Sequence, residues 1–182
     1  MIKIQKVFAK EIFDSRGTPT LAVTVTAGDF SATFAVPSGA STGSNEALEL
    51  RDGDKKYHNG KGVNSVIANV NGPINDTLVD MNVLDQRGID KTIMKLDGTP
   101  DKSHLGANAM IGVSIAVAKA AALARKLPTF KYLRSLADIK PSQKAPFLYM
   151  NLINGGMHAK TRLAFQEYHV VPETEDVSKA FT

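Results

Sequence analysis

The sequence TLAVTVTA (residues 20–27), together with the run FSATFAV (residues 30–36) that follows it, determines how the first part of this chain folds. In both runs aliphatic or aromatic residues alternate with small or hydroxyl-bearing ones, a period of two that is typical of a strand with one buried face. Only Gly28 and Asp29 separate the two runs. A third run with strand character precedes them at residues 2–13. The pattern therefore predicts an antiparallel meander of three strands with one covered face.

Helical periodicity replaces the strand pattern after the polar, glycine-rich stretch PSGASTG (residues 37–43). The run from Ala107 to Lys126 is rich in small and aliphatic residues, which is typical of a helix enclosed on several sides. Pro128 is expected to end that helix. The segments expected to be helical are 45–52, 62–70, 73–80, 85–96, 107–126 and 129–137.

A polar link with two prolines at residues 138–146 is the best candidate for a domain boundary. It divides the chain into a domain at residues 1–140 and a second part at residues 141–182. The elements expected in the second part are strands at 147–153 and 163–171 and a helix that begins at Glu173 and is still running at Thr182.

Composition excludes several classes of function. The chain has 182 residues and no cysteine, so disulfides, cysteine-bound zinc, iron–sulfur clusters and thiol nucleophiles are excluded. The formal charge of +4 comes from scattered basic residues, which argues against a nucleic-acid partner. No signal peptide begins the sequence, and charged residues interrupt the longest apolar run, so we expect a soluble protein with no membrane span.

Two loops carry residues that could support chemistry. The first, SGASTG (residues 38–43), offers hydroxyls and unhindered backbone groups between glycines. Such a loop can close over an anion or give a serine oxygen to a hard cation such as Mg²⁺. Taken alone, the same residues also describe an ordinary surface connection, which is the commoner case.

The second loop, GGMH (residues 155–158), places His158 nine residues before Glu167. Gln166 and Glu167 lie in an otherwise apolar strand pattern, where an unpaired carboxylate is costly to bury and usually has a partner or a task. The alternatives are a histidine that faces solvent and a glutamate on the outer face of the strand.

Several independent motifs, in order and at the right spacing, resemble those of the enolase family. They are DSRG (14–17) with Pro19 and Thr20, VPSGASTG (36–43), EALELRDGD (46–54), LGANA (105–109), and NGGMHA (154–159) with Gln166 and Glu167. The resemblance implies an α+β fold: the enolase N-terminal (capping) domain at 1–140, a three-stranded antiparallel meander followed by helices. It also implies that 141–182 form the incomplete start of the C-terminal β/α barrel.

The resemblance further implies an activity and a set of roles. Enolases (phosphopyruvate hydratases) are cytoplasmic glycolytic lyases that interconvert 2-phosphoglycerate and phosphoenolpyruvate plus water with two Mg²⁺ ions per site. The implied roles are catalysis for Glu167 and His158, substrate binding for His158, Gln166, Glu167, Ser38, Gly39 and Ala40, and a metal ligand for Ser41.

Much of the family's catalytic apparatus has no counterpart in these 182 residues. In enolases the three carboxylates that hold the first Mg²⁺, the base lysine and the principal acid glutamate come from later barrel strands. We therefore expect the chain alone to be inactive and not to bind Mg²⁺ tightly, because a single serine ligand cannot compete with water.

The chain also departs from the family pattern inside the matched motifs. Thr18 replaces an asparagine, and Ala22 replaces an acid that helps to pair subunits, which weakens the inference of a homodimer. Lys160 and Thr161 replace a glycine and an asparagine in the second lid, which puts its closing motion in doubt.

Two interpretations follow. The chain is either part of a glycolytic enolase, which an end within a helix favours, or a truncated enolase-like paralogue acting as a binding or scaffold module, which the departures favour. In either case the apolar strands after residue 146 lack the barrel helices that would cover them. We expect residues 1–140 to be well ordered and the remaining strands to need cover from elsewhere.

Overall fold

The computed structural model describes residues 1–39, 43–137, 144 and 146–181. These residues form two compact units, one made of residues 1–39 and 43–137 and the other of the described residues from 144 onward.

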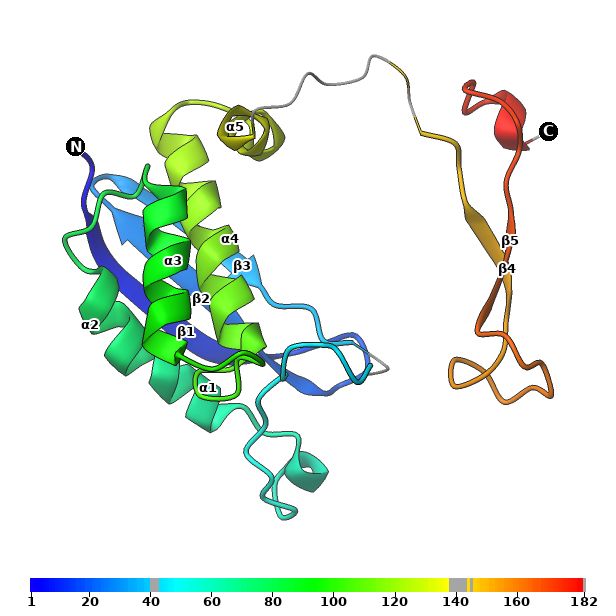
Figure 1. The fold of residues 1–182 in the computed structure, drawn as a ribbon, viewed down its shortest axis with the longest axis horizontal. Helices are drawn as coiled ribbons and strands as arrows, with labels where there is room; N and C mark the ends of the chain where they lie inside the picture. The colour runs from blue at the N-terminus through cyan, green and yellow to red at the C-terminus, as the bar shows by residue number, and fades with distance from the viewer. Residues whose placement is uncertain (40–42, 138–143, 145, 182) are drawn as a thin grey trace. The chain divides into compact units, whose positions relative to one another are not determined.

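The first unit begins with an antiparallel sheet of three strands in the order β1-β2-β3 (Figure 1). The strands are β1 (Ile4–Phe13), β2 (Pro19–Ala27) and β3 (Phe30–Ala35). Val25 in the central strand lies opposite Val7 in β1 and Ala32 in β3. The meander predicted from the period-two pattern is therefore confirmed.

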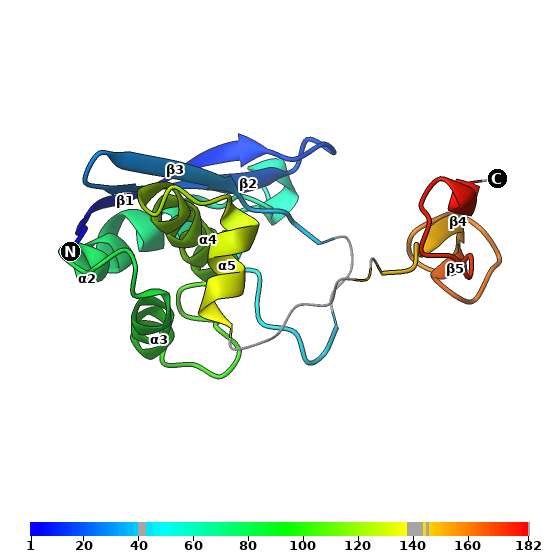
Figure 2. The ribbon, with the colours of Figure 1, turned by 90° about the horizontal axis from the view of Figure 1, so that it is seen from above.

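Helices follow the sheet and lie on one of its faces, as Figure 2 shows for α3, α4 and α5. Their bounds are η1 (His58–Gly60), α1 (Asn64–Asn69), η2 (Val70–Ile74), α2 (Asn75–Leu78), α3 (Gln86–Asp97), α4 (Ala107–Ala124) and α5 (Thr129–Leu136). The predicted helices at 62–70 and 73–80 are one continuous helical run, because the wide π-helical turn η2 accommodates Pro73 between α1 and α2.

The wide turn and the first residue of α2 also protect the free edge of the sheet. Asn71 accepts a hydrogen bond from the Ala9 N–H at 2.6 Å and donates one to the Ala9 carbonyl at 3.1 Å. Asn75 accepts a hydrogen bond from the Val7 N–H at 2.9 Å. Backbone groups that β1 would otherwise leave open to another strand are therefore satisfied by two asparagines.

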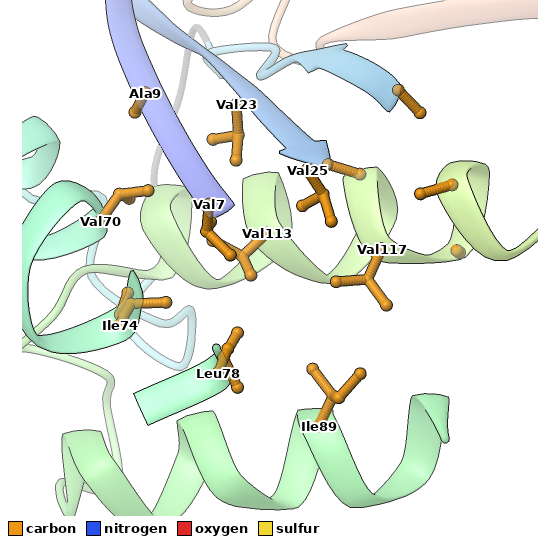
Figure 3. Packing of buried hydrophobic residues seen from close by; sticks show 14 of the residues in the cluster. Val7, Ala9, Val23, Val25, Val70, Ile74, Leu78, Ile89, Val113 and Val117 are labelled. Atoms are coloured by element: carbon orange, nitrogen blue, oxygen red, sulfur yellow. The ribbon is translucent and has the colours of Figure 1, made fainter. Parts of the chain in front are cut away.

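The hydrophobic core lies between the sheet and α4. The side chains of Leu21, Val23 and Val25 are fully buried in β2. Figure 3 shows Val113 and Val117 of α4 beside the valines of β1 and β2. By length and composition α4 could cross a membrane, but more than half of it is buried within this unit, as expected for the enclosed core helix.

The helix expected at residues 45–52 is not present, and this prediction is wrong. The backbone of this segment bonds to distant parts of the chain instead of to itself. The Leu48 N–H donates to the Asp101 carbonyl at 2.7 Å, and the Leu48 carbonyl accepts from the Ala107 N–H at 2.8 Å. Asn108 in α4 adds two bonds to the backbone of Leu50. Tertiary hydrogen bonds therefore override the local helical pattern.

The second unit contains an antiparallel pair of strands, β4 (Met150–Asn154) and β5 (Glu167–Val170), shorter than the predicted runs. The helix expected from Glu173 is absent from the described residues, which hold only a 3-10 turn, η3 (Lys179–Phe181). The Asp176 N–H donates to Thr174 Oγ1, and the Ser178 N–H donates to Asp176 Oδ1. Short polar side chains thus compete with the helical hydrogen bonds.

Helix α4 approaches the sheet most closely at Gly112. A Cβ atom there would lie 2.7 Å from Val23 Cγ2 and 2.9 Å from Val36 Cγ2, closer than packed atoms allow. We expect Gly112→Ala to lower the free energy of unfolding by about 1–2 kcal/mol, because overpacking outweighs the gain in helix propensity. Urea denaturation followed by circular dichroism measures this change.

The matched control is Gly72→Ala in the helical turn η2, where an added Cβ would meet no atom within 4 Å. It should leave stability unchanged or raise it by up to about 1 kcal/mol. A Gly112→Ala variant as stable as the wild type would show that the close approach is not a constraint.

Asp97 is a buried carboxylate at the end of α3 that holds the following loop. It accepts hydrogen bonds from the Leu105 N–H at 2.8 Å, from the Thr99 N–H at 3.0 Å and from the Thr99 hydroxyl. Burial opposes ionisation and is the largest single influence, but these bonds together hold the pKa of Asp97 below its ordinary value.

A lowered pKa in the folded state means that Asp97 stabilises the fold above its ordinary pKa of 3.8 and that this contribution is lost as pH falls below it. We expect Asp97→Asn to be about 1–3 kcal/mol less stable at pH 7, because an amide group then faces a backbone donor. The variant should lose less additional stability than the wild type between pH 7 and pH 3. Urea denaturation across this range, with the exposed Asp29→Asn as control, provides the measurement.

Candidate functional site

The first candidate loop leaves the sheet at Ser38, and two arginines hold it there. Arg16 pairs through Nε and Nη2 with Asp14 Oδ2 at 3.0 and 2.9 Å. The same Nη2 donates to the Ser38 carbonyl at 3.0 Å. The hydrogen bond from the Thr18 N–H is the main reason why the pKa of Asp14 lies below its ordinary value. Desolvation of the carboxylate raises this pKa, and the contacts with Arg16 lower it further. The DSRG motif therefore forms a charged turn that fixes the start of the loop.

Arg51 is the second of these arginines, and it lies in the segment at residues 45–52, which forms no helix. Its Nη2 donates to Ser38 Oγ at 2.9 Å and lies 2.5 Å from Glu49 Oε1. Its Nη1 donates to the carbonyls of Pro19 and Lys61 at 2.6 and 2.7 Å. With its side chain only 19% exposed, Arg51 ties the start of β2, the loop at Ser38 and the segment before α1 together.

Of the residues predicted in the first loop, Ser38 and Gly39 lie within the described part of the chain. Ala40 and Ser41 lie outside the described residues. The predicted contact of the loop with substrate, and the predicted metal ligand Ser41, remain predictions.

The second candidate loop depends on a pair of glycines. The N–H groups of Gly155 and Gly156 donate to the carbonyls of Gln166 and Leu163, both at 3.0 Å. A Cβ at position 155 would lie 2.4 Å from the Phe165 carbonyl oxygen, and Gly156 has a φ of +53°. Residues with side chains fit neither position well, so the glycines allow the turn to lie against the chain that leads into β5.

This turn brings His158 to the beginning of β5. His158 Nδ1 lies 3.7 Å from Glu167 Oε1, within ion-pair distance when the imidazole is protonated. The Glu167 side chain is 41% exposed, and that of His158 is 26% exposed. The described structure therefore brings together two of the residues predicted to share a site. The backbone carbonyl of Gln166 accepts the hydrogen bond from the Gly155 N–H described above.

Reasoning from the sequence missed three residues in these two regions. Arg16 and Arg51 stand in recognised motifs, but nothing in their spacing indicates that both reach Ser38. The third is His169, whose Nε2 lies 3.0 Å from Oε2 of Glu167. A signal for it was available, because residues two apart on a strand share a face.

Within the part of the chain that the structure describes, no group of three or more histidine, aspartate or glutamate side chains is placed to hold a metal ion. These residues do not by themselves fit a magnesium cage.

Taken together, the described elements define an α+β protein in which a three-stranded antiparallel sheet is followed by helices and then by a short two-stranded piece. The family model described as the enolase N-terminal domain matches residues 4–133. The model described as the enolase C-terminal TIM barrel domain matches residues 142–181. The chain belongs to the enolase family, with the N-terminal domain and a short start of the barrel domain.

The contacts of Arg51 predict how the segment at residues 48–53 responds to mutation. Arg51→Lys keeps the positive charge. The lysine ammonium group, however, lacks the planar fork with which the guanidinium reaches all four acceptors at once. We expect the free energy of unfolding to fall by about 1–3 kcal/mol. Amide exchange should become faster at Asp52, whose N–H bonds to the Gly62 carbonyl at 2.9 Å. Denaturation and hydrogen-exchange NMR measure the two effects.

The matched control is Arg134→Lys on the exposed surface of α5, which should change neither quantity. Equal exchange at Asp52 in the wild type and in Arg51→Lys would mean that Arg51 does not hold this segment.

Proposed function

We propose that this chain contributes the N-terminal part of an enolase active site, for the interconversion of 2-phosphoglycerate and phosphoenolpyruvate in the cytoplasm. The observation that carries the proposal is the match of both enolase domains, in order, along the chain. We place the boundary between them near residue 140, with residues 1–140 as the capping domain and 141–182 as the incomplete barrel.

Within that active site the residues of the first loop form part of a lid. Ser38, Gly39 and Ala40 contribute to substrate binding, and Ser41 is the magnesium ligand. The two arginines that bond to Ser38 support this role, because a lid that moves needs a fixed base from which to move.

The residues of the second unit form one wall of the site. Gln166 and Glu167 line the substrate pocket, and Glu167 takes part in acid–base work near the leaving hydroxyl. His158 lies on the second lid and binds substrate. The 3.7 Å approach of His158 Nδ1 to Glu167 Oε1 supports this assignment, because it places both side chains in the same part of the second unit.

By itself, the 182-residue chain lacks the base lysine and the carboxylates that later barrel strands supply in this family. Proton abstraction and stabilisation of the enediolate account for most of the barrier reduction in such a reaction. We infer that the chain alone does not turn over substrate.

Incubation of the pure chain with 2-phosphoglycerate and Mg²⁺ tests this inference. We expect no phosphoenolpyruvate above the level of a reaction without protein, whereas an intact enolase under the same conditions should produce it. Titration of Mg²⁺ into the chain by calorimetry should give no tight binding. Formation of phosphoenolpyruvate at enzyme-like rates would refute the proposal.

A second candidate function is that of a binding or scaffold module. The exposed apolar side chains of the second unit favour it: Tyr149 is 70% exposed, Phe165 74% and Met157 88%. For a homodimer through β2 the support is weak, because Ala22 is only 5% exposed and carries no charge that a partner could pair. A parent gene with a full barrel downstream would favour the enzyme, and a stop codon after residue 182 the module.

A further inference from the structure

A run of sequence without any acidic residue spans α4 and α5. All 18 acidic residues of the chain lie outside residues 102–137. The basic residues within this run are Lys102, Lys119, Arg125, Lys126, Lys131 and Arg134. The last four lie at the end of α4, in the turn after it and in α5, and all four are exposed. This end of the first unit is therefore rich in positive charge.

The same region exposes large apolar side chains. Leu123 near the end of α4 and Leu127 in the following turn are both exposed. In α5, Phe130 is 67% exposed and Leu133 is 47% exposed. Four such side chains within eleven residues are more than the scattered apolar residues of an ordinary surface, and a group of this kind typically marks a binding surface.

The buried residues of α5 show which of its faces points outward. Tyr132 is buried and Leu136 packs against the core, and residues four apart lie on one face of a helix. At 3.6 residues per turn, Phe130 and Arg134 fall on the opposite face, with Lys131 beside them. The outer face of α5 therefore presents an aromatic ring between basic side chains.

A tight turn places α5 next to the end of α4. The Leu127 N–H donates to the Ala122 carbonyl at 2.9 Å, and the Tyr132 N–H donates to the Pro128 carbonyl at 3.1 Å. Figure 1 shows α5 beside the C-terminal end of α4. We use the name α5 surface for the exposed residues Leu123, Arg125, Lys126, Leu127, Phe130, Lys131, Leu133 and Arg134.

The positive charge of the α5 surface is not neutralised within the chain. None of its four basic side chains has an ion-pair or hydrogen-bond partner among the described residues. Two acids act on the buried face of α5. Burial is the main reason why the pKa of Tyr132 lies above its ordinary value; Arg125 lowers this pKa, and Asp85 and Asp90 raise it further. Four bases against these two acids still leave a net positive charge.

We propose that the α5 surface binds a lipid membrane rich in anionic headgroups. The leucines and Phe130 enter the boundary between headgroups and acyl chains, while the basic side chains pair with lipid phosphates. A nucleic acid matches the charge but leaves the leucines in water, and a second copy sets four bases against four bases. The binding is peripheral, because α5 has only eight residues, and it does not depend on the proposed function.

Co-sedimentation of the whole 182-residue chain with vesicles tests this proposal. Vesicles of equal parts phosphatidylglycerol and phosphatidylcholine should bind the chain, and vesicles of phosphatidylcholine alone should not. Binding to the anionic vesicles should weaken as salt is added, because the charge contribution is screened.

Variants locate the binding surface. Phe130→Ser should lower the partition coefficient by about tenfold, because a buried ring is lost. Lys131→Glu should lower it by at least about fivefold. The matched controls are Phe165→Ser in the second unit, whose ring is also exposed, and Lys91→Glu, the same change of charge on the exposed side of α3. Each control should change the coefficient by less than about twofold.

NMR of the wild-type chain with a spin-labelled anionic lipid gives a second measurement that needs no variant. The amide signals of residues 123–134 should broaden most. Broadening confined to the second unit, equal binding to neutral vesicles, or wild-type binding by Phe130→Ser overturns the proposal. A lipid-free dimer that covers the α5 surface in dilute solution overturns it as well. No result depends on phosphoenolpyruvate formation, so failure here leaves the proposed function standing.

Discussion

The structure depends on the close packing of α4 against the central and third strands of the sheet. A sheet with one apolar face must be covered, and here a single helix rich in alanine and valine provides most of the cover. The absence of a side chain at Gly112 lets the helix backbone approach Val23 and Val36. Val36 immediately follows β3, so this close approach also lies next to the point where the chain leaves the sheet.

The loop at Ser38 is organised by charge and not by regular structure. Arg51 reaches it because the segment around residues 48–53 is extended and bonded to Asp101, Ala107 and Gly62. Asp52, the next residue, accepts hydrogen bonds from the backbone of Asn64 and Ser65 and so ties the segment to the start of α1. One irregular stretch therefore links the helices to the base of the predicted lid.

The sequence predicted those elements whose information is local. The three strands and α4 are confirmed because their periodicity reports burial directly. The helix at 45–52 was wrongly predicted because the partners of that backbone lie far away in the chain, where no periodic pattern can indicate them. The helix from Glu173 was wrongly predicted because Thr174 and Asp176 bond to nearby N–H groups. At the candidate site, motifs indicated Ser38, His158 and Glu167. They did not indicate the contacts of Arg16 and Arg51 with Ser38, or that of His169 with Glu167, because these contacts form only when the chain folds.

The two units hold their candidate site residues by different means. In the first unit a continuous core supports the arginines that fix Ser38. Among the described residues of the second unit, only Gly155 and Ala180 are buried, so packing contributes little to its geometry. The position of His158 must then come from the glycine turn and from the polar contacts on one face of the hairpin.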